Sequence, residues 1–213
     1  MPPLPQPEVA PGESDIRLAF AQQLVELGTR DRRVVVLDGD LGNSTRADVF
    51  ADHFPERFLQ IGIAEQNMIG VAAGLAAAGL RPIAVTFAAF ATSRDLDQVR
   101  VMVTQTDLPV VIVGAYAGIL TGTTGKTHQC IEDLAVFRVI PRITVFAPGD
   151  CREVRAAIVE AVGRGSPAYI RLSRDSSPPI FPPAMCCRWG DRAYSSKVQT
   201  SGSSRVVFRL LGP

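Results

Sequence analysis

Little in this chain points to a metal site, a disulfide framework or a strongly charged surface. Its four cysteines show no Cys-x-x-Cys spacing, and it has two histidines and one tryptophan. This cysteine usage argues against a zinc site and against a disulfide framework, and it indicates reduced thiols in a cytoplasmic protein. The net charge is +1, and the scattered arginines form no basic run interleaved with aromatic residues. We therefore expect no nucleic-acid partner and no bound metal held by this chain.

Long hydrophobic runs are also missing. The longest stretch of low charge, residues 66–80, is too short to cross a bilayer and is rich in glycine and alanine. The N-terminus has neither a basic segment nor an apolar one, so we expect no secretion signal and no membrane partner. What remains is an ordinary globular composition, 46% apolar and 20% charged, in 213 residues. That length suffices for one domain with a real core.

Apolar runs alternate with helical patterns along most of the chain. Residues 34–37 are continuously apolar, as in a strand buried on both faces. Residues 15–27 have a helical period, with Ser14 as the expected N-cap and Gly28 as the expected stop. The alternation predicts an α/β fold, a doubly wound and mainly parallel sheet with helices on both faces. Further strands are predicted at residues 58–61, 83–86, 110–113, 144–146 and 168–172, and further helices at 65–78, 93–104, 131–138 and 151–163.

The two ends of the chain differ from this alternating region. Residues 1–12 hold five prolines and are predicted to be a disordered or extended leader. Residues 176–183, rich in serine and proline, are interpreted as a linker. Residues 184–213 have no clear period apart from an apolar run at 206–211, and a segment this short cannot form a core of its own. We therefore predict one domain over residues 13–175.

Glu65 is the most informative single residue. It stands in Gly-Ile-Ala-Glu-Gln-Asn, residues 62–67, between an apolar strand and a helix of small residues. Open α/β sheets bind ligands at such strand ends, and a carboxylate that enters an apolar junction needs a partner. Glu65 is either paired structurally or held there to exchange a proton, and the residues alone leave both interpretations open.

Three further segments follow predicted strands, each with an ordinary alternative. The loop at residues 38–45 either offers backbone and hydroxyl groups to a ligand or forms a simple turn with an Asx cap. Phe87 and Phe90 either stack on a planar heterocycle or belong to the core. His128, in a Gly/Thr-rich loop, either binds or moves protons or stands on the surface at a helix start. His53 has no chemical context and is interpreted as structural.

In order along the chain, these motifs resemble the pyrimidine-binding domain of transketolase-type thiamine-diphosphate enzymes. The pattern comprises an Asp-Leu loop, Ile-Ala-Glu-Gln-Asn, Thr-Phe-x-x-Phe and Gly-x-x-Gly-x-Thr-His-Gln, spread over residues 13–175. The C-terminal subunit of split bacterial transketolases is the most similar type. The resemblance implies an enzyme subunit that transfers a two-carbon ketol unit between sugar phosphates with the help of thiamine diphosphate.

The resemblance also implies how the cofactor would be held. Glu65 matches the acid that bonds the ring nitrogen of the aminopyrimidine and favours its imino form, which removes the proton from the thiazolium carbon. Phe87 and Phe90 match the aromatic residues that enclose the pyrimidine. Further matches to cofactor-lining positions are Asp40, Leu41 and Ile63.

Substrate contacts are implied in the same way. His128 matches a histidine that contacts substrate oxygens. Arg17, Ser44 and Arg174 match positions that hold the terminal phosphate of the sugar, a role that suits the fixed fork of donors on arginine. The ordinary alternative for each arginine is a surface ion pair of little consequence.

Two residues depart from the family pattern. Thr124 stands where transketolases have an acidic residue that reads a hydroxyl group of the donor, and Tyr116 stands where they have a second histidine. A modified sugar phosphate is therefore a second hypothesis for the substrate.

Two parts of the family are not found in this sequence. The magnesium-diphosphate motif, Gly-Asp-Gly with a later asparagine, is absent, so the resemblance implies a partner subunit that holds the diphosphate and Mg²⁺. The C-terminal domain of the family is missing as well, and the tail after residue 183 is interpreted as a truncated or frame-altered end. The small residues at 70–74 would permit close helix contact with the partner or in a self-associated form, or would simply pack within the domain.

The rival hypotheses are of two kinds. Within the superfamily, 1-deoxy-xylulose-5-phosphate synthase and the β subunit of 2-oxoacid dehydrogenases share the same domain and use pyruvate or another 2-oxoacid. Outside catalysis, the chain is either an assembly subunit or an inactive remnant.

Overall fold

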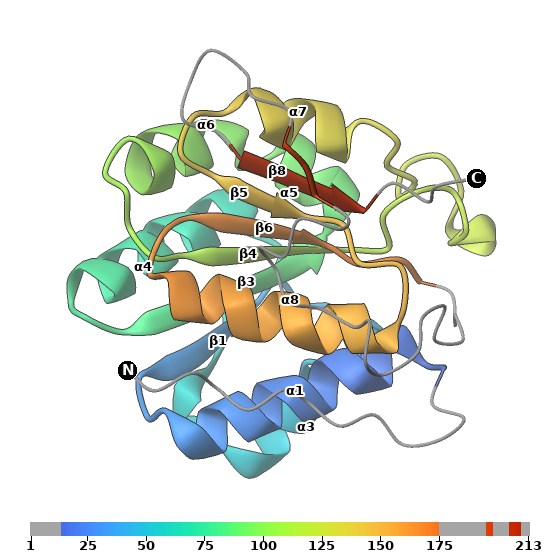
Figure 1. The fold of residues 1–213 in the computed structure, drawn as a ribbon. Helices are drawn as coiled ribbons and strands as arrows, with labels where there is room; N and C mark the ends of the chain where they lie inside the picture. The colour runs from blue at the N-terminus through green and yellow to red at the C-terminus, as the bar shows by residue number, and fades with distance from the viewer. Residues whose placement is uncertain (1–13, 175–194, 198–204, 210–213) are drawn as a thin grey trace.

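The computed structural model describes residues 14–174 and the backbone of two further strands at residues 195–197 and 205–209. The predicted leader and linker lie outside the described residues. Eight strands form one sheet in the order β2-β1-β3-β4-β6-β5-β8-β7 (Figure 1). All neighbours from β2 to β8 pair in parallel, and β7 pairs antiparallel with β8. The strands are β1 (Val34–Asp38), β2 (Phe58–Gln60), β3 (Arg81–Phe87), β4 (Val111–Ala115), β5 (Thr144–Phe146), β6 (Ala168–Arg171), β7 (Ser195–Lys197) and β8 (Arg205–Arg209).

Helices cover both faces of the sheet, as the predicted doubly wound fold requires. One face carries α1 (Ile16–Arg30), α3 (Asp48–His53) and α8 (Cys151–Arg164), which share a single apolar cluster with the strands. The other face carries α4 (Glu65–Ala77), the π-helix η2 (Val99–Thr104) and α7 (Asp133–Val139) (Figure 1). The shorter helices are α2 (Gly42–Thr45), α5 (Ala88–Ser93), α6 (Leu96–Gln98) and the 3₁₀ turns η1 (Pro55–Arg57) and η3 (Gly122–Thr124).

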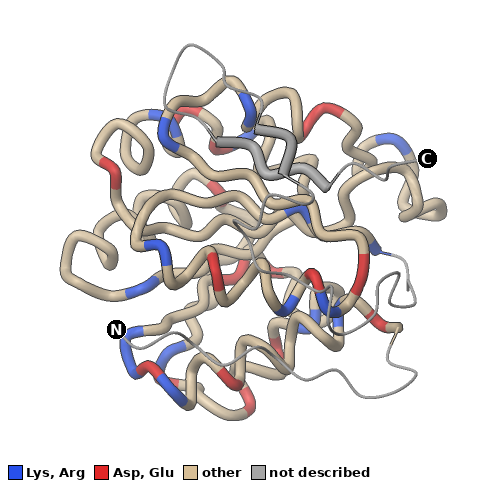
Figure 2. The backbone as a smooth tube through the Cα atoms, in the orientation of Figure 1, with Lys and Arg blue, Asp and Glu red and all other residues tan. Residues whose placement is uncertain are grey.

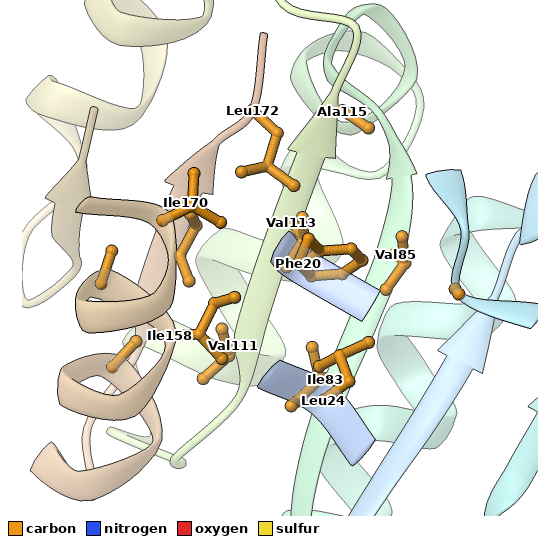
Figure 3. Close-up of a cluster of buried hydrophobic side chains, with 14 of the residues drawn as sticks. Phe20, Leu24, Ile83, Val85, Val111, Val113, Ala115, Ile158, Ile170 and Leu172 are labelled. Carbon is orange, nitrogen blue, oxygen red and sulfur yellow. The ribbon is translucent and has the colours of Figure 1, made fainter. Parts of the chain in front are cut away.

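Strand β4 shows how a continuously apolar strand contributes side chains to the core on both faces of the sheet. Val111 and Val113 belong to the cluster under α1 and α8, where Phe20 and Ile158 pack against them (Figure 3). Ile112, between them in the sequence, belongs to the cluster on the α4 side. Successive side chains point to opposite faces of a sheet, so a strand covered on both sides must be apolar throughout.

The predicted limits of the first helix are wrong at both ends. Asp15 rather than Ser14 is the N-cap, since its Oδ1 accepts bonds from the backbone N–H groups of Arg17 and Leu18. Gly28 does not stop the helix, which continues to Arg30. A Cβ at Gly28 would lie 2.6 Å from the ring of Phe50, so this glycine lets α1 approach α3 closely.

The helix predicted at residues 93–104 begins later, at Leu96, because Ser93 is the last residue of α5. The chain breaks between α5 and α6 at Arg94 and Asp95, and the helix resumes as α6 and η2. The short elements α2, α3 and η1 had no periodic signal, because fewer than two turns cannot show a helical period.

Charges of both signs are interspersed along the described chain (Figure 2). Within residues 14–174 and the two C-terminal strands, no helix is both long and apolar enough to cross a membrane. Groups of three or more side chains suited to holding a metal ion are also absent from this part of the chain.

Candidate active site at the carboxyl edge of the sheet

The parallel register brings five separate segments to one edge of the sheet. Residues paired across the sheet at this edge include Asp38 of β1 with Gln60 of β2, and Phe87 of β3 with Ala115 of β4. The loops that follow these strand ends hold nearly all of the predicted site residues, with Arg174 after β6. This edge is where open α/β sheets bind their ligands.

Glu65 is the first residue of α4 and is buried, with 3% of its surface exposed. Nη1 of Arg94 donates a hydrogen bond to its Oε1 at 2.8 Å. The side chain of Arg94 is 43% exposed, and its guanidinium lies 3.8 Å from the ring centroid of Phe90. The structural pairing that the sequence left open is therefore present.

A second carboxyl group, that of Asp95, belongs to the residue that follows Arg94 in the chain. Asp95 is fully buried, and neither of its carboxyl oxygens has a hydrogen-bond partner among the described residues. Burial raises the pKa of Asp95 well above its ordinary value, and the negative charge of Glu65 raises it further. A buried carboxyl group without a partner avoids the cost of an isolated charge by keeping its proton.

An aromatic row runs along the edge from Arg94 towards the end of β4. The ring centroids of Phe90 and Phe87 are 5.8 Å apart, and those of Phe87 and Tyr116 are 4.3 Å apart with an interplanar angle of 21°. His128 meets both phenylalanines edge-on, at 5.9 and 5.4 Å. Phe87 belongs to the core at 4% exposure, whereas Phe90 is partly buried, and stacking of the pair on a planar heterocycle stays a prediction.

Two arginines lie near Tyr116, at the far end of this row. Nη1 of Arg17 donates to the carbonyl oxygen of Ser44 at 3.4 Å and lies 3.5 Å from Oη of Tyr116. The Tyr116 hydroxyl donates to the same carbonyl at 3.3 Å. The guanidinium of Arg174 lies 5.5 Å from the Tyr116 ring centroid. The three residues that the resemblance assigns to a phosphate, far apart in sequence, thus converge around Tyr116.

Tyr116 itself adopts an unusual backbone conformation. Its φ is +58°, in the left-handed region that a tyrosine seldom enters. Strain of this kind is kept where the surrounding structure fixes it, often at functional sites. Here the stack on Phe87 and the bonds to Arg17 and Ser44 hold the side chain between the aromatic row and the arginines.

The loop after β1, residues 38–45, contains a simple turn, which was one of the two interpretations of this segment. Oδ2 of Asp38 accepts bonds from the N–H groups of Leu41 and Gly42 at 3.0 and 3.1 Å, and from Nε2 of Gln60 at 2.9 Å. Burial raises the pKa of Asp38, although these three bonds oppose the rise. The turn directs Asp40, with φ +66°, and the partly buried Leu41 to the edge of the sheet.

Two other predicted residues have simpler surroundings. Ile63 is 72% exposed, just before Glu65 in the chain, so it offers an apolar surface at the edge. The hydroxyl of Thr124, in the turn η3, is hydrogen-bonded to that of Thr121. His53 lies away from this group, at the end of α3, with Nδ1 bonded to the carbonyl of Val49.

Sequence reasoning missed Arg94 and Asp95. Both fall in the stretch that was predicted as one continuous amphipathic helix. A charged pair inside an amphipathic pattern is ordinarily a solvated face, so no signal distinguished them. Tyr116 was noted as a departure from a family pattern, but its position between two arginines had no signal in the sequence.

Comparison with known proteins agrees with this geometry. The sequence profile of the transketolase pyrimidine-binding domain matches residues 13–179. A putative transketolase C-terminal section of Methanocaldococcus jannaschii is 41% identical over 166 residues, which cover 78% of this chain and 52% of that protein. A 6-deoxy-6-sulfo-D-fructose transketolase subunit of a Clostridium species is 41% identical over 167 residues, with the same two coverages. The chain thus spans about half the length of these curated relatives.

Solved structures are similar as well. A split-gene transketolase described as an inactive β4 tetramer aligns with a TM-score of 0.72 and 43% identity, over 83% of this chain and 57% of that one. Transketolase from Campylobacter jejuni aligns with a TM-score of 0.74 over 84% of this chain and 29% of its own length. Its identity of 24% makes that likeness one of fold alone.

Proposed function

The chain belongs to the transketolase family and contains its pyrimidine-binding domain, and on that premise we propose that it is one subunit of a thiamine-diphosphate-dependent transketolase. The enzyme would transfer a two-carbon ketol unit between sugar phosphates. The family domain implies thiamine diphosphate as the cofactor. The single observation that carries the proposal is Glu65, a buried carboxyl group at the ligand-binding edge of the sheet, beside a row of aromatic rings.

The residues at this edge fit an aminopyrimidine. A carboxyl group can share a proton with a ring nitrogen, and aromatic faces can pack on a planar ring. Glu65 would bond the ring nitrogen, and Phe87 and Phe90 would enclose the ring, with Ile63 and Leu41 as apolar contacts. When bound, the cofactor supplies a nucleophilic thiazolium carbon. Within residues 14–174 and the two C-terminal strands no cluster suits a metal, so Mg²⁺ and the diphosphate would be held by the partner.

The task of Glu65 is to hold a proton at that ring nitrogen. In the structure its Oε1 is instead occupied by a hydrogen bond from Nη1 of Arg94. Arg94 is 43% exposed and also stacks on Phe90, so it can remain in place on the ring if its bond to Glu65 is lost. The pair is therefore compatible with a carboxyl group that changes partner when the cofactor binds.

The two arginines at the other end of the aromatic row support an anionic substrate. Arg17 and Arg174 present guanidinium groups near the Tyr116 hydroxyl, and guanidinium groups bind tetrahedral oxyanions through several parallel bonds. His128 would contact the substrate oxygens from the intervening position. A phosphate or a sulfonate would suit this end chemically, and one relative is described as acting on 6-deoxy-6-sulfo-D-fructose. Thr124, whose hydroxyl is engaged by Thr121, would leave the donor hydroxyl without an acidic contact.

Partner dependence is supported by a split-gene relative whose structure is described as an inactive β4 tetramer. The N-terminal transketolase subunit is the expected partner, and self-association would complete the assembly. The small-residue face of α4 offers room for such contacts. Ala72 and Ala73 are buried within the domain, whereas a Cβ at Gly74 would meet no atom within 4 Å. The face would therefore serve internal packing on one side and leave open surface on the other.

The test is reconstitution with the N-terminal subunit, with turnover measured on a ketose phosphate and an aldose phosphate acceptor. Glu65→Gln keeps the size of the side chain but removes its ability to exchange a proton, and we expect a loss of about 10²–10⁴-fold in kcat. Glu56→Gln is the matched control, because the Glu56 side chain is 68% exposed and its partner is its neighbour Arg57. Unchanged turnover in Glu65→Gln would refute the proton-holding role and favour a non-catalytic subunit.

Substrate choice separates the rivals within the superfamily. Turnover of a ketose phosphate without pyruvate supports ketol transfer. Product formation that requires pyruvate or another 2-oxoacid would instead assign the chain to a deoxyxylulose-phosphate synthase or to a 2-oxoacid dehydrogenase β subunit.

A further inference from the structure

The proposed function leaves one question about protons. Glu65 has to share a proton with a ring nitrogen, yet in the structure its Oε1 accepts a hydrogen bond from the guanidinium of Arg94, and arginine does not give up its protons in proteins. A site that works near neutral pH needs a source for that proton close by. The described residues offer one candidate.

Asp95 directly follows Arg94, at the junction of α5 and α6. Its carbonyl oxygen accepts the N–H of Val99 at 2.9 Å, so its backbone begins the helical segment in the usual way. Its side chain makes no capping hydrogen bond, although aspartate at this position normally does. Instead the whole residue is buried, and both carboxyl oxygens lack a partner among the described residues.

From α4, Glu65 is the acid whose charge acts on Asp95. From the chain before it, Arg94 directs its guanidinium to Glu65 and to the ring of Phe90. On α6, Asp97 is 69% exposed and pairs with Arg100 at 2.8 Å, away from the buried group. The cluster thus consists of two carboxyl groups and one guanidinium.

We propose that Asp95 is a positioning residue of this site, whose buried carboxyl group carries the proton that Glu65 uses. This inference rests on the proposed function. At rest, Glu65 is the carboxylate paired with Arg94, and Asp95 is the neutral acid. Burial of Asp95 raises its pKa most, and the charge of Glu65 raises it further.

The proton balance within the cluster is simple. The O–H bond of Asp95 breaks, an O–H bond forms on Glu65, and the negative charge moves from Glu65 to Asp95. The charge thus moves to the residue that follows Arg94 in the chain. The net charge of the three groups stays at zero, which is why the transfer is feasible in a buried site where an added charge would be costly.

The first test uses the isolated full chain without cofactor or partner. ¹³C NMR of labelled aspartate and glutamate carboxyl groups is recorded from pH 5 to pH 9 for the wild type, Asp95→Asn, Glu65→Gln and the exposed control Asp97→Asn. We expect the wild type to contain a protonated aspartate at pH 7 that disappears in Asp95→Asn. It should persist in Asp97→Asn and in Glu65→Gln, where its titration moves to lower pH. The difference between the wild type and Asp95→Asn separates Asp95 from Asp38, whose pKa burial also raises.

An ionised Asp95 at pH 7 in the wild-type chain would overturn the inference. So would a Glu65→Gln variant in which the titration of Asp95 stays where it was. Both outcomes are read from the protein alone, so they do not depend on whether the chain proves to be a transketolase.

The second test uses the reconstituted enzyme. Asp95→Asn keeps the shape of the side chain and a neutral group, but it removes the proton. We expect kcat at pH 7.5 to fall at least tenfold with little change in KM for the sugar, and to recover as the pH is lowered, since solvent then protonates Glu65. A structural role would not give recovery at low pH, and a wild-type pH profile in Asp95→Asn would overturn the inference. Absence of turnover in the wild type would count against the proposed function, while the NMR result would still decide the state of Asp95.

Discussion

Gly114 in the central strand β4 is the position where one added methyl group should cost most. A Cβ at this residue would lie 2.2 Å from Oη of Tyr169, and 2.7 and 2.8 Å from two carbons of its ring. The ring cannot simply move aside, because it is fully buried and stacks on Phe137 at a centroid distance of 3.8 Å. Its hydroxyl donates to Oδ2 of Asp133 at 3.1 Å.

The expected magnitude follows from these contacts. Overpacking a tight core costs about 1–3 kcal/mol. Displacing the hydroxyl from Asp133 removes a hydrogen bond to a charged acceptor, which contributes about 1.5–3 kcal/mol. The sum, about 2.5–6 kcal/mol, is a large part of the roughly 5–15 kcal/mol that a domain has in total. We therefore expect Gly114→Ala to be strongly destabilised although it lies in a strand, where alanine is ordinarily acceptable.

Urea denaturation of the isolated chain measures this loss. With a slope of about 2 kcal/mol per molar urea, the midpoint should fall by roughly 1.2–3 M. Gly163→Ala is the matched control: its Cβ would meet no atom within 4 Å, and alanine in helix α8 should stabilise by about 0.5–1 kcal/mol. In a Tyr169→Phe background, which lacks the closest atom, Gly114→Ala should cost less. A midpoint shift below about 0.5 M for the single variant would contradict the reasoning.

Three further outcomes are expected. Gly28→Ala should destabilise by about 1–3 kcal/mol in urea, because its Cβ would lie 2.6 Å from Phe50; a neutral result would mean that α1 and α3 separate easily. Asp31→Asn should lower the free energy of unfolding at pH 7 but not at pH 2. The hydrogen bond from Arg33 lowers the pKa of Asp31 below 3.8, so the contribution of Asp31 to stability is lost as the pH falls through that lowered pKa. An equal loss of stability at both pH values would exclude this ion pair as the cause. Gly74→Ala should leave the stability of the isolated chain unchanged or higher but weaken assembly with the partner in analytical ultracentrifugation, and unaltered assembly would remove this face from the interface.

The predicted fold was confirmed where the pattern is local and repeated. The six parallel strands β1 to β6 lie close to the predicted ranges, because a strand buried on both faces has to be continuously apolar. Helices with several turns were found because their apolar residues recur with a helical period. The errors concern ends and interruptions: Gly28 has a packing role rather than a stop, and the helix predicted at 93–104 breaks at Arg94 and Asp95. Neither the capping bond of Asp15 nor this break follows from periodicity.

The sequence by itself determined the order of strands and helices, and hence which loops meet at one edge of the sheet. Strand direction and crossover handedness are general rules, so residues that follow parallel strands must gather there. What only the tertiary structure decided is the partner of each charge. Glu65 and Arg94 are 29 residues apart, Arg17 and Tyr116 are 99 apart, and Asp95 is fully buried although its own segment shows no reason for it. Which side chains pair depends on how the packed helices and strands are oriented against each other. That orientation depends on side chains throughout the core, so it cannot be inferred from any single segment of the sequence.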